Sequence, residues 1–435
     1  MRKYLLAGTA LVAMTNFAHA DDSMTMAGIT LYGTVDMGVA YQTHGVPTGD
    51  TPASIESLIS KNEGKSRFNA APNGLSQSKI GLKGEETLVD GWSGVFKLET
   101  GFNPYSGQLG DGLKSLTQNN GVPLAQQTAN GDSSRAGQPF QGGAYAGLSN
   151  KTFGTLTFGR QNSLMLDNIG KYDPQAGSYN FSPIGYSGVA SGSGDTENAR
   201  VDNSVKYANA IGPVRVSGLY KFGGVSGNQG SSVQAGLGTN LGALSVDTNF
   251  AHVKDAISAG ILGTTSASAG LNTLSGTVSD NTSYAVMASY DFGQPKLFAG
   301  YEYISFANPS VPLPTNFVDI GGYVLSSVNN TAYANHKILQ ISWGGVKYAV
   351  SPNFDLAGAY YHYDQNSYKG NGCSNSSAAS CSGQLNAASL VADYHLSKRL
   401  DVYGGAMWSS VANGLASGYL HSATIDPAVG VRFSF

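Results

Sequence analysis

Apolar and polar residues alternate with a period of two along much of this chain, and its last eight residues, AVGVRFSF (428–435), show the pattern plainly. One face carries Val429, Val431, Phe433 and Phe435. The other face carries Ala428, Gly430, Arg432 and Ser434. This alternation is typical of a β-strand with one apolar and one polar face. Clear further examples are 28–42, 78–86, 91–102, 212–223, 281–293, 387–397 and 399–409. Weaker ones are 142–149, 154–161, 200–209, 231–240, 242–253, 295–306, 336–350 and 353–364.

Short and long connections alternate between these stretches. The seven short ones are 87–91, 150–154, 209–213, 240–243, 292–295, 350–353 and 396–399. The eight long ones lie near 43–77, 103–141, 162–199, 224–230, 254–280, 307–335, 365–383 and 410–425. Fifteen connections join about sixteen strands, and both chain ends then lie on the side of the short turns. We expect no helix to interrupt the series. The pattern predicts an all-β protein, a transmembrane antiparallel β-barrel with short periplasmic turns and long extracellular loops.

The composition agrees with such a barrel. Only 12% of the residues are charged, Gly occurs 58 times, and Tyr (24) outnumbers Phe (17). The mean hydropathy is only −0.14, because alternation hides the apolar residues from an average. Closure would pair every backbone group that faces lipid, so the last strand must pair with the first, near 29–41. A barrel of about sixteen strands is too wide for side chains to fill, so its centre holds water. A soluble β-sandwich would alternate too, but it would not need the asymmetry between short and long connections.

The first twenty residues have the pattern of a secretory signal peptide. Arg2 and Lys3 precede an apolar stretch at 4–14, and Ala18-His19-Ala20 forms a small-residue cleavage site. The apolar stretch is too short for a transmembrane helix. Cleavage would leave residues 21–435 as the barrel domain, with 23 basic and 28 acidic residues. This acidic balance argues against a nucleic-acid partner.

Two cysteines, Cys373 and Cys381, bracket a loop rich in Ser and Asn. In an exported chain such a pair predicts a disulfide, and the rival metal site would lack any His or acid between them. The histidines show no metal-ligand spacing, and no nucleophile motif stands out. We therefore expect no enzyme and no cofactor. An outer-membrane phospholipase would need an activated Ser–His pair, which the sequence does not offer.

Several stretches resemble the Gram-negative general diffusion porin family, in particular its proteobacterial branch. They are ITLYGTVDMGV, SKIGLKGEETLVDGWSGVFKLETGF, YAGLSNKTFGTLTFGRQ, DNSVKYANAIGPVRVSGLY and the terminal Phe. The resemblance implies a homotrimer in the outer membrane, in contact with lipid and lipopolysaccharide, with one pore per barrel. It also implies that the third long loop folds into the pore, and we assign this constriction loop to 102–140. Phe435 resembles the signal that such proteins present to the outer-membrane insertion machinery.

The family pattern places basic residues on the pore wall, facing acids on the inward loop. Lys79 and Arg160 match wall positions, Arg200 and Lys206 surround the next motif, and Asp111 is the candidate acid on the loop. Alternation independently directs Lys79, Arg200 and Lys206 inward. It directs Arg160 outward, so only the resemblance or a bulge would turn Arg160 inward. Such a cluster predicts a mild anion preference, unless these charges are ordinary solvated lumen residues.

The sequence thus predicts an outer-membrane porin, a channel for passive diffusion of small hydrophilic solutes and ions. A substrate-specific channel is one alternative, for which Tyr361 and Tyr363 would form an aromatic slide rather than part of an interfacial girdle. A non-conducting surface adhesin or structural barrel is another.

Overall fold

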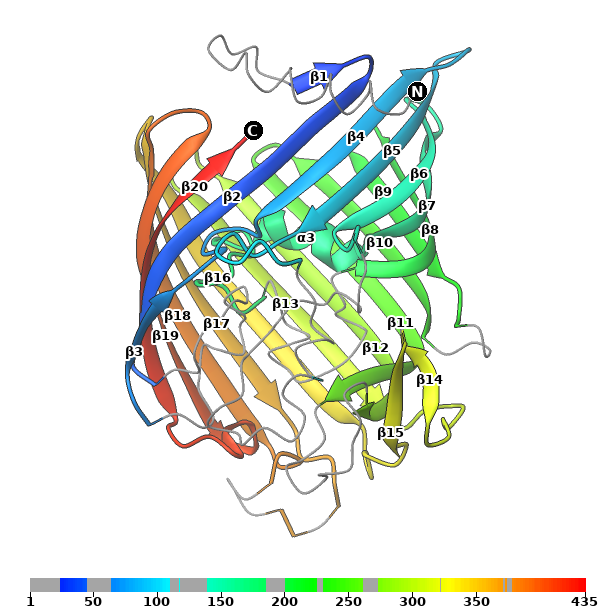
Figure 1. The fold of residues 1–435 in the computed structure, drawn as a ribbon, viewed down its shortest axis with the longest axis vertical. Coiled ribbons are helices and arrows are strands. Elements are labelled where there is room, and N and C mark those ends of the chain that lie inside the picture. The colour runs from blue at the N-terminus through cyan, green and yellow to red at the C-terminus, as the bar shows by residue number, and fades with distance from the viewer. Residues whose placement is uncertain are drawn as a thin grey trace.

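The protein folds into one closed β-barrel (Figure 1). The computed structural model describes residues 24–44, 64–109, 117, 139–184, 200–224, 230–260, 273–320, 322–370, 372–373 and 378–435. The predicted signal peptide, 1–20, lies outside these ranges. Among the described residues, no helix is long and apolar enough to cross a membrane.

Sixteen strands of the described chain form the barrel wall, as the alternation predicts. The first eight are β2 (Ile29–Gln42), β4 (Lys79–Thr87), β5 (Trp92–Gly101), β6 (Gly143–Asn150), β7 (Gly154–Asn162), β8 (Arg200–Ile211), β9 (Val214–Lys221) and β10 (Ser231–Leu241). The others are β11 (Leu244–Gly260), β12 (Thr273–Asp291), β13 (Lys296–Ala307), β16 (Lys337–Ser351), β17 (Phe354–Gln365), β18 (Gly383–His395), β19 (Leu400–Asn413) and β20 (Ala423–Ser434). Each pairs antiparallel with the next, and β20 returns to β2 from Thr34↔Ser434 to Ala40↔Ala428. The last strand therefore closes the cylinder on the first.

Short turns and long loops lie at opposite rims. The turns between β4 and β5, β8 and β9, or β18 and β19 lie at the rim that also holds the C-terminus (Figure 1). A short strand, β1 (Met24–Met26), folds back at this rim and pairs with the first residues of β2. At the other rim, β3 (Arg67–Ala70) pairs with the end of β2. A hairpin of β14 (Phe317–Ile320) and β15 (Tyr323–Asn329) lies beside the extended β12 there.

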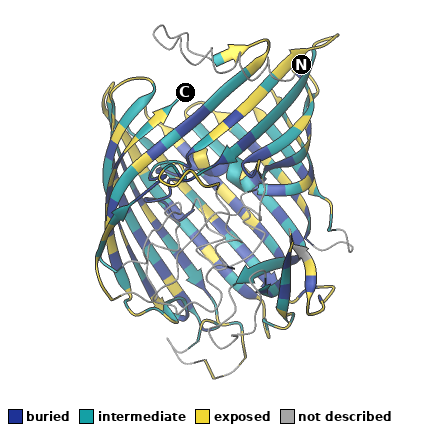
Figure 2. Cartoon of the chain, viewed as in Figure 1, coloured by how far each residue is buried: buried dark blue, intermediate teal, exposed yellow. Residues whose placement is uncertain are grey.

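The apolar face of the strands points outward. On β20, Val429, Val431 and Phe433 keep 55%, 44% and 43% of their surface exposed, while their neighbour Ala428 is buried. Figure 2 shows the same alternation of exposed and less exposed residues along the strands. In a membrane these side chains contact lipid. Because the sheet is closed, it has no edge with unpaired backbone N–H and C=O groups exposed to lipid.

A helix of the described chain lies inside the barrel, which corrects the expectation that no helix interrupts the strands. It is α3 (Leu164–Tyr172), about halfway between the two rims (Figure 1). The Ser163 hydroxyl caps it by accepting from the amide of Leu166. Asn168 donates to Asn249 on β11, and Trp343 on β16 donates to the carbonyl of Tyr172. The helix is thereby fastened across the inner wall.

The chain continues along the inner wall after the helix. Tyr361 on β17 donates to the Asp173 carboxylate at 2.6 Å, and Gln175 donates to Ser389 on β18. Phe181 then packs edge-on against Tyr403 on β19. Residues 163–184, which we call the inner belt, thus run past the inner faces of β10 to β19.

An apolar cluster fills the space between the inner belt and the wall. Tyr361 and Tyr363 are 0% and 1% exposed within it. Ile169 and Tyr172 of the helix belong to the same cluster, together with Trp343. These two tyrosines therefore form neither an interfacial girdle nor a slide along the pore. Because the belt covers them, they hold it in place.

Candidate functional site

A carboxylate surrounded by basic side chains lies on the inner wall where β2, β4 and β5 meet. Glu99 on β5 is 4% exposed and faces inward. Its Oε2 lies 3.5 Å from Nζ of Lys79 and 3.1 Å from Nζ of Lys97. The Tyr32 hydroxyl donates to the same oxygen at 2.9 Å. One acid is therefore shared by two ammonium groups, which leaves the wall positive here.

Arg200 joins this group from β8. Its Nε donates to the carbonyl of Gly142 at 3.2 Å, and Nη2 donates to Gln77 at 3.1 Å. The guanidinium is close enough for its charge to act on both Glu99 and Lys97. The strand alternation does not bring it there, because Asn203 has a φ of 49° and breaks the period between Arg200 and Ser204.

Lys206 lies six residues further along β8 than Arg200 and contacts helix α3. It pairs with Asp167 in the first turn of α3 and donates to the carbonyl of Asn162 at 3.1 Å. Asn162 in turn donates to Asp167 at 3.1 Å. An acid of the inward-folded loop thus faces a base of the wall.

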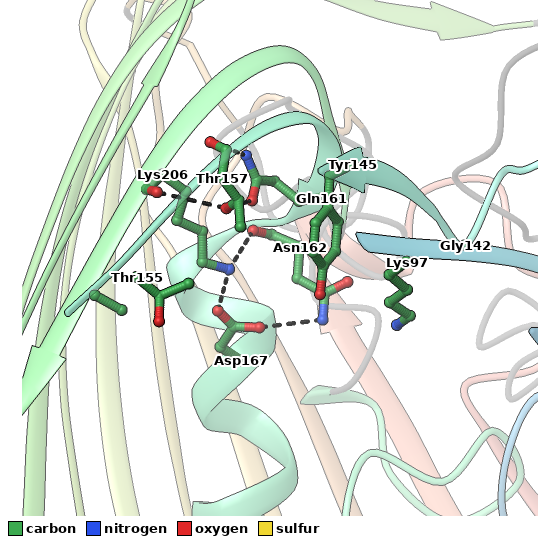
Figure 3. Close-up of a pocket in the computed structure, with 10 residues that line it drawn as sticks. Lys97, Gly142, Tyr145, Thr155, Thr157, Gln161, Asn162, Asp167 and Lys206 are labelled. Carbon is green, nitrogen blue, oxygen red and sulfur yellow. Dashed lines mark hydrogen bonds and ion pairs between the residues drawn. The ribbon is translucent and has the colours of Figure 1, made fainter. Parts of the chain in front are cut away.

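A cavity of about 160 Å³ adjoins this pair (Figure 3). Lys97 and Lys206 line it, together with the ring of Tyr145 and the hydroxyls of Thr155 and Thr157. Tyr145 is the direct cross-strand partner of Lys97. The cavity carries two ammonium groups and the Asp167 carboxylate, so it suits water and small ions rather than apolar molecules.

Arg160 is placed differently from the other basic candidates. The ladder slips between Gly159 and Gln161, and Gly159 has a φ of 128°, which a residue with a side chain rarely adopts. At this bulge Arg160 is 8% exposed, donates Nε to the carbonyl of Gln141 at 2.7 Å and pairs with Asp202 at 2.6 Å. Arg160 therefore does not face lipid, and the contacts described here do not join it to Glu99.

The predicted constriction loop, 102–140, falls largely outside the described residues. This includes Asp111, so its role stays a prediction. Among the described residues, the inner belt, from the connection 162–199, lies inside the barrel, and residues 71–75 pack against it. In chain order this connection is the third long one, whereas 102–140 is the second. The acid facing the wall that the structure describes is accordingly Asp167.

We call Lys79, Lys97, Glu99, Asp167, Arg200 and Lys206 the wall cluster. Two other groups of side chains lie away from it. Cys373 and Cys381 are joined by a disulfide, with Cα atoms 5.5 Å apart, in the long loop after β17. In the part of the chain that the structure describes, Asp393, His395 and Asp401 lie within reach of one another. Arg432 pairs with both aspartates, so we assign no metal site to this group.

Sequence reasoning missed four residues of the site. Lys97 and Glu99 share the inward face of FKLE with no motif to mark them, and Tyr32 lies on the inward face of the first strand. Asp167 had a signal that could have found it. Ser163 precedes it as a helix cap, and Pro174 follows the helical segment.

Known proteins match this chain over nearly its whole length. The family model described as Gram-negative porin matches residues 7–413. An outer membrane porin protein of Bordetella pertussis is 24% identical over 444 residues, with all of both chains covered.

Solved structures share the fold at lower identity. The anion-selective porin from Comamonas acidovorans has a TM-score of 0.62 and 19% identity, covering 94% of this chain and 99% of its own. OmpT of Vibrio cholerae, expressed in the outer membrane, has a TM-score of 0.58 and 14% identity, covering 95% of this chain and 100% of its own. The family match spans most of the barrel, and the chain therefore belongs to the Gram-negative porin family.

Proposed function

We propose that the basic wall cluster gives this channel a preference for anions. As a Gram-negative porin, the protein lies in the outer membrane and lets small hydrophilic solutes and ions diffuse through its barrel. Its wall charges then decide which ions pass more readily. The observation that carries the proposal is the single carboxylate of Glu99 shared by Lys79 and Lys97, with Arg200 beside it.

The sign of the preference follows from the local charges. Four cations and two anions make up the cluster, so its formal charge is +2; they are Lys79, Lys97, Arg200, Lys206, Glu99 and Asp167. The chain as a whole is acidic, but ions in a narrow aqueous gap respond to the nearest charges. The low-dielectric wall focuses this field into the gap.

One similar structure supports the proposal. The porin from Comamonas acidovorans is named as anion-selective. That property belongs to that protein, and at 19% identity the likeness extends to the fold. It nevertheless agrees with the charge of the wall described here.

Reversal potentials in a salt gradient test the preference. Replacing Lys79 and Arg200 together by Glu changes the cluster from +2 to −2, so we expect the reversal potential to move toward cation preference. The neutral pair Lys79→Gln and Arg200→Gln should move it part of the way, with less repulsion of Glu99. Lys151→Glu, in the exposed turn between β6 and β7, is the matched control and should leave the value unchanged. An unchanged value in both double variants would remove these residues from the selectivity filter.

The family makes the protein a channel, and we propose that it has no catalytic activity. Single-channel conductance separates this function from its alternatives. Large ohmic steps are expected of a porin, block by one solute would indicate a substrate-specific channel, and silence would indicate a structural barrel. The burial of Tyr361 and Tyr363 speaks against an aromatic slide built from them.

We further propose that the barrel assembles as a homotrimer in contact with lipid and lipopolysaccharide, and that Phe435 is read by the outer-membrane insertion machinery. A solved form of OmpT of Vibrio cholerae is described as a trimer, which supports this state for a related fold. Cross-linking in isolated outer membranes should give a trimer band, and a monomer band alone would contradict it.

A further inference from the structure

His395, the last residue of β18, has a carboxylate at each ring nitrogen. Its Nδ1 lies 2.7 Å from Asp401 on β19, and its Nε2 lies 3.2 Å from Asp355 on β17. A neutral imidazole has one N–H donor and one lone pair, and an ionised carboxylate only accepts. Both contacts are therefore hydrogen bonds only when the ring carries two protons and a positive charge.

The other charged groups around His395 come from neighbouring strands. Lys347 on β16 pairs with Asp355 at 2.8 Å. Arg432 on β20 pairs with Asp401 at 2.7 Å and with Asp393 on β18 at 3.5 Å. With His395 these residues form what we call the mouth cluster: Lys347, Asp355, Asp393, His395, Asp401 and Arg432.

The mouth cluster faces the lumen at the periplasmic rim. Tyr394, Val402 and Val431 alternate with its members and are 47%, 40% and 44% exposed on the outer surface. His395 immediately precedes the short turn 396–399, which carries Lys398 and Arg399. A row of cross-strand partners runs from His395 through Asp401 and Arg432 to Asp36 on β2. Asp36 is itself held by the amides of residues 75 and 76 and by Tyr403.

The proton on His395 decides the charge of this rim. Three aspartates and two fixed cations surround it, so the formal charge of the cluster is zero with imidazolium and −1 with neutral imidazole. Imidazole is the side chain whose ordinary titration range lies near neutrality.

We propose that His395 is a proton-dependent charge at the periplasmic mouth, so that the channel passes relatively more cations once the imidazole loses its proton. This goes beyond the wall cluster, which lies on other strands, and it rests on the channel function proposed above. A charge that faces the lumen at the rim, unlike one in an exposed turn such as Lys151, acts on every ion that enters or leaves. Over a few ångströms of water, one unit charge changes an ion's local concentration about two- to threefold.

The test measures the anion-to-cation permeability ratio in planar bilayers from about pH 5 to about pH 9, across the imidazole range, first without and then with EDTA. The wild-type ratio should fall about two- to threefold as the pH rises. His395→Gln should hold the high-pH ratio throughout, and His395→Lys should hold the low-pH ratio. His252→Gln on β11 is the matched control and should follow the wild type.

Two results would overturn the proposal. One is a His395→Gln channel that keeps the wild-type pH curve, and the other is a wild-type shift that disappears in EDTA, because a bound divalent cation would then be the charge. Normal single-channel conductance of each variant shows that it has folded. A protein without conductance would instead contradict the channel function itself, and a failure of the Lys79 and Arg200 variants would concern only the wall cluster.

Discussion

Gly33 and Phe435 exchange two backbone hydrogen bonds. The amide of Gly33 donates to the carbonyl of Phe435 at 2.9 Å, and the amide of Phe435 donates to the carbonyl of Gly33 at 3.0 Å. The last residue of the chain therefore completes the seam between β20 and β2. Beyond it, β1 takes over the same edge of β2 from Ile29 to Leu31. β1 and the last residue of the chain therefore complete this edge of β2 together.

Deleting Phe435 should impair assembly in the outer membrane. Both backbone groups of Gly33 would lose their partners at the edge of the lipid phase, where an unpaired group costs several kcal/mol. Export does not use this contact, so the chain should still reach the periplasm. Cell fractionation followed by a test for heat-modifiable migration measures both steps. A normal yield of folded protein in the outer membrane would contradict the prediction.

Gly33→Ala tests the same seam from the other strand. A Cβ at this position would lie 2.5 Å from the ring of Phe435 and 2.7 Å from the carbonyl of Lys79. We expect a loss of about 1–3 kcal/mol in barrel stability, as for other overpacked positions. Gly94→Ala on β5 is the matched control, since its Cβ would meet nothing within 4 Å. Unfolding by urea in detergent should separate the two variants, and equal midpoints would argue against a tight seam.

Tyr172→Phe should loosen the inner belt. The hydroxyl donates to Asp247 at 2.6 Å and lies 2.8 Å from the Ser245 hydroxyl, and its removal should cost about 1–3 kcal/mol. Burial and then the hydrogen bond to Asp247 raise the pKa of Tyr172 to about 12. Because the folded value lies above the ordinary one, this stabilisation is complete below about pH 10 and is lost as the pH rises through about 12.

Stability in denaturant at two pH values checks this. The gap between wild type and Tyr172→Phe should be full at about pH 8 and smaller at about pH 11.5, across the range in which this phenol ionises. Tyr290→Phe, an outward residue of β12, should show no gap at either pH. A gap that widens with pH would contradict the donor role of the hydroxyl.

The alternation in the sequence was sufficient to predict the wall of the barrel. Successive side chains of a regular strand point to opposite faces of the sheet. The outward face of Val429 and the inward face of Lys79 could therefore be predicted from their positions along the strand alone. The pairing of neighbouring strands could also be predicted, because two strands joined by a tight turn must lie side by side. The same local logic placed β20 against β2, since a closed barrel leaves the last strand no other partner.

Alternation did not predict the inward and outward faces correctly where the strand itself is irregular. Between the pairs Gly159↔Ser204 and Gln161↔Val201, β8 has one residue more than β7, and Asn203 departs from the extended form there, so the count of faces shifts by one on β8. The inner belt escaped prediction for another reason. Its contacts, such as Tyr361 with Asp173, join residues far apart in the sequence, and no local period records them. The cap at Ser163, the apolar face of Leu164, Ile169 and Tyr172, and Pro174 after the helix were the local signals that marked it.

Arg160→Ala should destabilise the barrel more than it changes selectivity. Arg160 is nearly buried and Asp202 has an exposed side-chain fraction of 21%, so the variant removes a close charge–charge contact of this aspartate near the wall. We expect a loss of about 3 kcal/mol, near the lower end for a broken buried ion pair. Asp202→Asn with Arg160→Gln should recover part of it. The melting temperature in detergent and the reversal potential of the same variant test this prediction. A selectivity change as large as that of the Lys79 and Arg200 variants would contradict it and show that Arg160 contributes to ion selectivity.

Replacing Cys373 and Cys381 by Ser should free the loop after β17 without closing the channel. The bond spans eight residues, and the loop-closure relation gives about 2.5 kcal/mol of stabilisation for a ring of this size. The carbonyl of Cys381 also accepts from Gln365 at 2.8 Å, so the loop should remain partly anchored. Protease treatment of intact cells should cut the double variant faster than wild type, and reduction of wild type should reproduce the difference. Conductance should stay the same, because the wall cluster lies on β4, β5 and β8. A loss of conductance in the folded variant would show instead that this loop shapes the pore.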